Sequence, residues 1–147
     1  MGEPAGIGVE IAIKAWFRRA MHDLSPFYLI ADPDHVQATV HRLTALDKRL
    51  RATPVLAEIN NPSEAVDCFD QALPVYPQPL ECKVQPGKLN KANASSVLKS
   101  IEQAVAHVRD GTALALVTNP IQKSVLYDAG FAHPGHTEFL AELCGGE

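Results

Sequence analysis

The sequence predicts an α/β domain with a mainly parallel sheet flanked by helices. Segments with the apolar spacing of amphipathic helices alternate along the chain with short, continuous apolar runs. Such runs are typical of strands that are buried on both faces, as in a parallel sheet. Alternation of the two kinds of segment favours the α/β class, and 147 residues are the size of one ordinary domain.

The first third of the chain is expected to contain a loop, a helix, a strand and a second helix. Residues 1–8 form a glycine-rich loop, and the apolar spacing predicts a helix over residues 10–21. The apolar run at residues 27–31 predicts a buried strand. Asp32, which a proline follows at the first helical position, is expected to cap the next helix.

The middle of the chain predicts two more strands and a long helix. The strands are expected at residues 53–59 and 73–76, the second among several prolines. The sequence Gln-Pro-Gly-Lys at residues 85–88 predicts a turn. The strongest helical pattern covers residues 93–109, and Gly111 is expected to end that helix.

The last part of the chain predicts one strand and two helices. Residues 113–117, Ala-Leu-Ala-Leu-Val, are the clearest candidate for a buried strand, and helices are expected at residues 121–128 and 137–143. An α/β unit normally begins with a strand that leads into its glycine-rich loop. We therefore expect residues 1–147 to be the N-terminal part of a longer α/β protein, with the first strand and the second half missing.

Composition and charge argue against several classes of protein. Lys and Arg number 13 and Asp and Glu 17, for a net charge of −4, whereas nucleic-acid and membrane-surface binders are usually basic. No apolar run is long enough to span a membrane, and no signal peptide is visible, so a cytoplasmic location is expected. The 3 cysteines fit no zinc pattern and are expected to be reduced thiols.

Three segments beside predicted strand or helix ends are candidates for a ligand site, since open α/β sheets bind ligands there. The first, Gly-Glu-Pro-Ala-Gly-Ile-Gly, includes Gly6 and Gly8. Glycines allow the backbone to approach a ligand, and the following helix N-terminus offers N–H groups to an anion. The spacing is neither the dinucleotide fingerprint nor a P-loop, so a structural turn is the alternative.

The second segment, Thr-Asn-Pro-Ile-Gln-Lys, directly follows the predicted strand at residues 113–117. Lys123 is a candidate to contact a phosphate group as a point charge, and an ordinary surface lysine is the alternative. Asn119 is a candidate contact in the same loop. The alternative for this loop is that Thr118 or Asn119 caps the next helix.

The third segment, His-Pro-Gly-His-Thr-Glu, places an imidazole, a hydroxyl and a carboxylate within three consecutive residues. His136 is a candidate to hydrogen-bond or exchange protons with a substrate hydroxyl or phosphate near neutral pH. The alternative is a loop histidine with Thr137 as the cap of the last helix. A complete metal site is not expected, because only one histidine is a convincing ligand and such sites need three or four.

Taken together, the motifs are much more specific than any one of them. Gly-Glu-Pro-Ala-Gly-Ile-Gly, Thr-Asn-Pro-Ile-x-Lys, Asp-Ala-Gly and Pro-Gly-His-Thr-Glu-Phe occur in this order, and Pro-Gly-Lys-Leu with a later Ile-Glu-x-Ala helix fits as well. In these motifs the chain closely resembles the 4-hydroxythreonine-4-phosphate dehydrogenase (PdxA) family, over essentially all 147 residues.

The resemblance implies an α/β fold similar to isocitrate dehydrogenases and a homodimer. It implies oxidation of 4-phosphooxy-L-threonine with NAD or NADP, then loss of CO2 to give 3-amino-2-oxopropyl phosphate in pyridoxine 5′-phosphate biosynthesis. It also implies a divalent metal (Zn, Mg or Co) at the substrate. The expected partner is thus a small phosphorylated amino acid, with neither nucleic acid nor a membrane.

In the family's Pro-Gly-His-Thr-Glu-Phe motif the histidine and threonine contact the substrate, which implies substrate binding by His136 and Thr137. The family's metal-binding histidines and most of its cofactor contacts lie downstream of this region, so no metal ligand is expected here and the chain alone is expected to be inactive. The alternatives are a paralogue acting on a four-carbon sugar-acid phosphate or dihydrodiol, and a non-catalytic remnant that binds a phosphorylated ligand. Candidates for supporting phosphate or loop contacts are Gly6, Gly8, Asn119 and Lys123.

Overall fold

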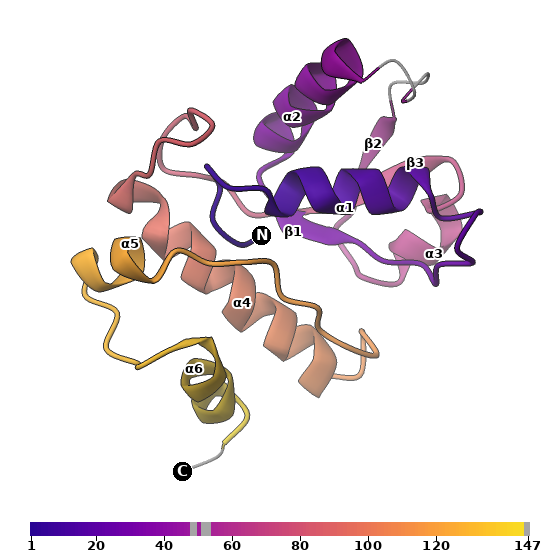
Figure 1. The fold of residues 1–147 in the computed structure, drawn as a ribbon. Helices are drawn as coiled ribbons and strands as arrows, with labels where there is room; N and C mark the ends of the chain where they lie inside the picture. The colour runs from indigo at the N-terminus through magenta and orange to yellow at the C-terminus, as the bar shows by residue number, and fades with distance from the viewer. Residues whose placement is uncertain (48–49, 51–53, 146–147) are drawn as a thin grey trace.

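The computed structural model describes residues 1–47, 50 and 54–145. Within them a three-stranded parallel sheet is flanked by helices, which confirms the predicted fold class (Figure 1). The predicted strand at residues 53–59 begins outside the described residues, and its described part forms β2. The elements in order are α1 (Gly8–Phe17), β1 (Leu29–Ala31), α2 (Pro33–Leu46), β2 (Val55–Glu58), α3 (Glu64–Cys68), β3 (Ala72–Pro77), a 3-10 turn (Lys91–Asn93), α4 (Ala94–Arg109), α5 (Lys123–Asp128) and α6 (His136–Leu143).

β3 is the central strand, because the strand order is β1-β3-β2. β1 pairs with it in parallel, with Leu29 opposite Val75, and β2 pairs with it through Val55 and Ala72. All of β1 is buried, whereas β2 at the edge of the sheet is partly exposed. The apolar runs of β1 and β3 therefore form buried parallel strands, as their composition predicts.

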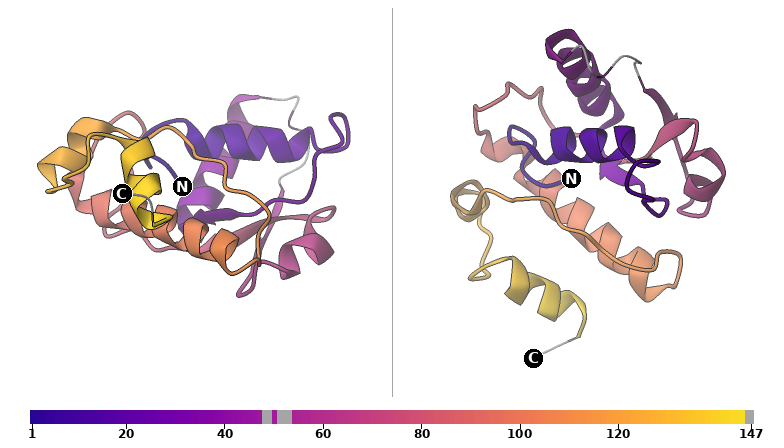
Figure 2. Two further views of the ribbon diagram at one scale, coloured as in Figure 1. Left: turned by 90° about the horizontal axis from the view of Figure 1, so that it is seen from below. Right: turned by 45° about the vertical axis from the view of Figure 1, so that its right-hand side comes forward.

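Helices cover both faces of the sheet. Alternate residues of a strand point to opposite faces, so the residues of β3 contact different helices on the two sides. Leu73 and Val75 join a core cluster with α1 and α2, whereas the Tyr76 hydroxyl accepts a hydrogen bond from Gln103 of α4 at 3.1 Å. Figure 2 shows the sheet lying between α1 and α4. The buried residues of the α1–α2 side are Val9, Ile13, Trp16, Leu29, Ala31, Val36, Val40, Leu43, Phe69, Leu73 and Val75.

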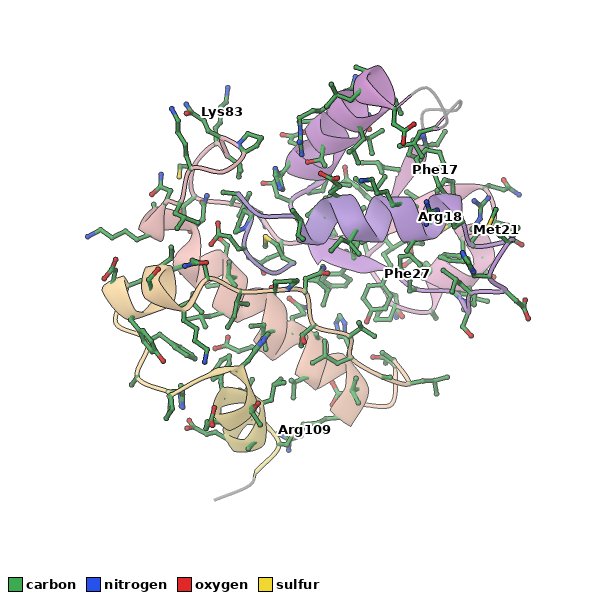
Figure 3. The ribbon with its side chains drawn as sticks, in the orientation of Figure 1. Phe17, Arg18, Met21, Phe27, Lys83 and Arg109 are labelled. Atoms are coloured by element: carbon green, nitrogen blue, oxygen red, sulfur yellow. The ribbon has the colours of Figure 1, made fainter. Side chains whose placement is uncertain are left out.

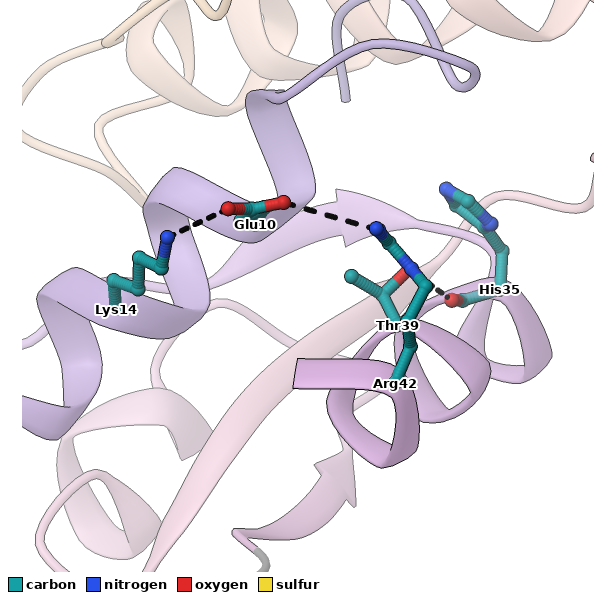
Figure 4. A network of polar contacts seen from close by, with 5 residues as sticks. All are labelled: Glu10, Lys14, His35, Thr39 and Arg42. Carbon is teal, nitrogen blue, oxygen red and sulfur yellow. Dashed lines mark hydrogen bonds and ion pairs between the residues drawn. The ribbon is translucent and has the colours of Figure 1, made fainter. Parts of the chain in front are cut away.

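A small polar network links α1 to α2 beside this core (Figure 4). Glu10 accepts a hydrogen bond from Lys14 at 2.6 Å and lies 3.9 Å from the guanidinium of Arg42. Partly exposed ion pairs of this kind contribute about 0.2–1 kcal/mol each. At the start of α2, Asp32 Oδ1 accepts the backbone N–H of His35 at 2.9 Å, which confirms the predicted cap.

The C-terminal half builds a second apolar cluster around α4. Gly111, at φ 73°, follows the end of α4 as predicted, and the two short helices predicted after it are present as α5 and α6. α6 packs against α4 on the side away from the sheet (Figure 1). The buried residues of this cluster are Ala94, Val97, Ile101, Val125, Leu126 and Phe139.

The predicted strand at residues 113–117 is wrong. This segment pairs with none of the described strands, and two of its three large apolar side chains are exposed: Leu114 at 101% and Val117 at 90%. A strand exists only where a neighbouring strand accepts and donates its backbone hydrogen bonds, and none of the described strands pairs with this segment. The apolar run therefore had the composition of a buried strand without the neighbour that would bury it.

The first helix is shorter than predicted, because α1 ends at Phe17 and not at residue 21. The chain then turns, and the backbone N–H of Arg19 donates to the Trp16 carbonyl at 3.1 Å. The Arg19 guanidinium lies 3.9 Å from the centre of the Trp16 ring. This cation–π contact accompanies the turn in which the helix ends.

A buried histidine joins α4 to the sheet and should make stability depend on pH. The Tyr28 hydroxyl and His107 Nδ1 share a hydrogen bond of 2.9 Å, and burial, opposed by the nearby charge of Asp110, lowers the pKa of His107 below its usual 6.5. The unfolded chain therefore binds more protons than the folded chain below about pH 6.5, so stability is complete above that pH and is lost as the pH falls.

We expect the free energy of unfolding, measured in urea, to fall between about pH 7 and about pH 5. His107→Gln should reduce this decrease, although His35 and His136, whose pKa values burial also lowers, should retain part of it. A free energy of unfolding that rises toward pH 5 would contradict the assignment. His22→Gln is the control, because this side chain is exposed.

Candidate functional site

The glycine-rich loop lies directly against the loop that follows α4. The backbone N–H of Glu3 donates to the Pro120 carbonyl at 2.9 Å, and the side-chain amide of Asn119 donates to the Met1 carbonyl at 3.3 Å. These two bonds join segments at opposite ends of the described chain. The amide of Asn119 is thus directed at the first loop and does not cap α5, whose N-cap is Gln122.

Glycine is required at two positions of this junction. A Cβ on Gly2, which has φ 82°, would lie 2.7 Å from Asn119 Cβ and 2.8 Å from the Pro120 carbonyl oxygen. A Cβ on Gly8 would lie 2.9 Å from Asn119 Cβ. Gly6, by contrast, is exposed and donates its N–H to the Glu3 carbonyl at 3.0 Å within the turn. Close packing of two loops therefore explains Gly2 and Gly8.

Gly8→Ala should lower the free energy of unfolding by about 1–3 kcal/mol, because the added methyl group overlaps Asn119. The measurement is urea denaturation monitored by circular dichroism. The double variant Gly8→Ala/Asn119→Gly removes the overlap with Asn119, although the Met1 carbonyl oxygen stays 3.0 Å from the added Cβ. It should recover at least about 0.5 kcal/mol relative to the sum of the single variants. Strict additivity would show that Asn119 is not the group that excludes the methyl.

The third candidate segment meets the second through Lys123. A Cβ on Gly135 would lie 3.2 Å from Lys123 Nζ and 2.9 Å from Glu138 Oε2, so the ammonium group lies over the start of α6. The Tyr127 hydroxyl donates to the Pro134 carbonyl at 2.6 Å and holds the same loop against α5. Lys123 is thus held beside the His136 segment.

His136 is the chemically distinctive group of this region. Its Nε2 is buried and has no hydrogen-bond partner within residues 1–47, 50 and 54–145. Burial lowers the pKa of His136 below its usual value, so the imidazole is neutral at pH 7. A buried polar nitrogen without a partner costs about 1–3 kcal/mol, and a bound ligand atom would satisfy it.

Thr137 is exposed and lies in the first turn of α6. The residue at the N-cap position is Gly135, so the alternative role of Thr137 as the helix cap is wrong. Its hydroxyl is therefore free of that capping bond. All three segments singled out in the sequence meet in one region, which contains Asn119, Lys123 and His136.

Among the described residues, no three His, Cys, Asp or Glu side chains gather to hold a metal ion. Sequence reasoning missed a second polar region next to the glycine-rich loop, where Glu3, Lys83 and Lys88 line a hollow. The sequence Gln-Pro-Gly-Lys at residues 85–88 predicted only a turn, and the structure confirms that turn. No signal within that turn points to the distant Glu3, since only the folded chain brings the two together.

Comparison with known proteins places this chain in a family. The model of the pyridoxal phosphate biosynthetic protein PdxA matches residues 23–147. The chain belongs to the PdxA family. The 4-hydroxythreonine-4-phosphate dehydrogenase of Methylorubrum populi is 49% identical over 149 residues, covering 100% of this chain and 40% of that protein. Its counterpart in Zymomonas mobilis is 43% identical, covering 99% and 40%.

Solved structures of PdxA dehydrogenases share the fold. A 4-hydroxythreonine-4-phosphate dehydrogenase from Burkholderia phymatum matches with a TM-score of 0.85 and 25% identity, covering 100% of this chain and 42% of that one. The enzyme from Klebsiella pneumoniae matches with a TM-score of 0.79 and 35% identity, covering 97% and 42%. The chain therefore spans about 40% of the length of the PdxA relatives that it matches.

Proposed function

We propose that this chain supplies one side of the substrate site of an NAD- or NADP-dependent dehydrogenase that oxidises and decarboxylates 4-phosphooxy-L-threonine to 3-amino-2-oxopropyl phosphate. The observation that carries the proposal is the buried Nε2 of His136, which has no hydrogen-bond partner among the described residues and lies beside Lys123. The names of the PdxA relatives, 4-hydroxythreonine-4-phosphate dehydrogenases, support this substrate. The product would serve pyridoxine 5′-phosphate biosynthesis.

The proposed role of these residues is to hold the phosphorylated substrate. Neutral His136 forms a hydrogen bond from Nε2 to a substrate oxygen, which satisfies the buried nitrogen. Thr137 donates its hydroxyl hydrogen to the same group. Lys123 balances the phosphate charge as a point charge. Together they fix one end of the substrate, and orientation of the reacting end follows from that anchor.

The loops that meet at Asn119 have a positioning role in this proposal. Gly2 and Gly8 let the first loop pack on Asn119, and the chain continues from there to Lys123. Gly6 donates its N–H to the Glu3 carbonyl within the turn, and we propose for it only a role in shaping that turn.

The metal and the nicotinamide cofactor have no fitting residues in the described part of the chain. No cluster of three or more metal-ligating side chains is present there, and the glycine-rich loop lacks the dinucleotide fingerprint. The part of the proposed reaction that we assign to residues 1–47, 50 and 54–145 is the binding of the phosphorylated end of the substrate. We further propose, as the PdxA relatives suggest, that the complete protein uses a divalent metal and NAD or NADP and acts as a cytoplasmic homodimer.

Turnover by the complete polypeptide tests the proposal. The assay follows the absorbance of NADH or NADPH with 4-phosphooxy-L-threonine, a four-carbon sugar-acid phosphate or an aromatic dihydrodiol as substrate. Preferential oxidation of 4-phosphooxy-L-threonine is expected. Preference for another substrate would make the protein a paralogue, and binding without turnover would favour the non-catalytic reading.

No helix in the described part of the chain is long and apolar enough to cross a membrane.

A further inference from the structure

A hollow of about 290 Å³ lies between the glycine-rich loop and the loop that joins β3 to α4. The backbone N–H of Gly87 donates to the Ala5 carbonyl at 2.8 Å, which ties these two distant parts of the sequence together. In Figure 1 the two loops lie side by side, next to the start of α4. The hollow is therefore a product of the fold and not of one local turn.

The charged groups that line the hollow favour an anion. Lys83 and Lys88 contribute two positive charges, and Glu3 contributes one negative charge. Glu3 is engaged within its own loop, because its Oε1 accepts the N–H of Ala5 at 3.0 Å. In the part of the chain that the structure describes, neither lysine has a carboxylate within ion-pair distance. Two unpaired cations thus border one hollow in a chain of net charge −4.

The wall of the hollow near α4 is held in place by side-chain hydrogen bonds. Asn93 is 4% exposed, and its amide bonds both backbone groups of Cys82, at 3.0 Å and 3.2 Å. Asn90 accepts the N–H of Ala92 at 3.0 Å and donates to Cys82 Sγ at 3.1 Å. An Asn amide carries two donor hydrogens, so Asn90 keeps one for a ligand.

Both lysines that line the hollow are exposed. Figure 3 shows the Lys83 side chain extending outward from the loop between β3 and α4, clear of the helices. Lys88 is exposed as well. A rigid wall that offers amide donors, bordered by two long cationic side chains, suits a ligand with several acceptor oxygens and about two negative charges.

We propose that this hollow is a binding site for a phosphate group of a small phosphorylated molecule, with Lys83 and Lys88 as its cations and Asn90 as a hydrogen-bond donor. This site is separate in its residues from the one at His136 and does not depend on the proposed reaction. Two sources share the chemistry: a phosphomonoester and the pyrophosphate of a dinucleotide. The volume of about 290 Å³ accommodates the phosphate-bearing end of either.

The test is a titration of the full 147-residue chain, labelled with 15N, followed by NMR at low salt. The probes are inorganic phosphate, O-phospho-L-threonine and ADP-ribose. We expect shifts of the backbone amides of Gly87 and Lys88 and of the side-chain amide of Asn90. Tighter binding of O-phospho-L-threonine at these amides would assign the site to phosphomonoesters, and tighter binding of ADP-ribose would assign it to a pyrophosphate.

Variants make the test decisive. The double variant Lys83→Gln/Lys88→Gln should weaken binding about five- to tenfold, whereas Lys99→Gln, an exposed lysine of α4 that does not line the hollow, should leave the dissociation constant unchanged. His136→Ala should not alter the shifts at Gly87 and Asn90, which separates this result from the fate of the proposed function. Unshifted amides, or equal affinity in the double variant and Lys99→Gln, would overturn the proposal.

Discussion

His136→Ala is expected to lower kcat/KM for 4-phosphooxy-L-threonine about 10- to 100-fold in the complete polypeptide. The variant removes the buried Nε2 that lacks a partner in the described chain and that we assign to a substrate oxygen. A hydrogen bond to a charged group contributes about 1.5–3 kcal/mol, which corresponds to that range of rates. Steady-state kinetics of NADH or NADPH formation measure the effect.

A neighbouring histidine provides the matched control. His133 lies three residues earlier, pairs with the exposed Glu142 at 3.4 Å and packs its ring against Phe131 and Phe139. His133→Gln should therefore change kcat/KM less than about threefold, since this side chain has no assigned contact with substrate. Equal losses in the two variants would show that the effect of His136→Ala arises from a disturbed α6 and not from a lost substrate contact.

Leu73→Ala is expected to destabilise the chain by about 2–5 kcal/mol. Leu73 lies on the central strand β3, has 0% exposure and packs in the cluster that joins the sheet to α1 and α2. Truncation leaves a cavity that the paired strands on both sides prevent from collapsing. Urea denaturation of the 147-residue chain measures the loss.

Leu114→Ala is the paired comparison, because the same truncation is made where the structure shows a fully exposed leucine. We expect a change within about 0.5 kcal/mol in the same chain. A loss comparable with that of Leu73→Ala would mean that residues 113–117 are buried as a strand in solution, as the sequence pattern predicted and the structure does not show.

Local chemistry predicted much of the candidate site. The side chains of Asn119, Lys123 and His136 suit a phosphorylated ligand, and the structure brings their segments into contact. Their partners were not predictable. Asn119 packs on Gly8, which is far away in the sequence, and Lys123 lies over Gly135 across a turn. Such contacts form only in the folded chain. The substrate roles of Gly6, Gly8, Asn119, Lys123, His136 and Thr137 remain predictions.

The sequence by itself determined the α/β class, the buried strands β1 and β3, the Asp32 cap and the end of α4 at Gly111, because these depend on apolar periodicity and on the local chemistry of caps. Only the tertiary structure decided that β3 is central, that residues 113–117 are not a strand, and that Lys83, Lys88 and Glu3 share one hollow. The physical reason is that a strand and a binding site are both defined by neighbours. Backbone hydrogen bonds and burial between distant segments form only when the chain folds.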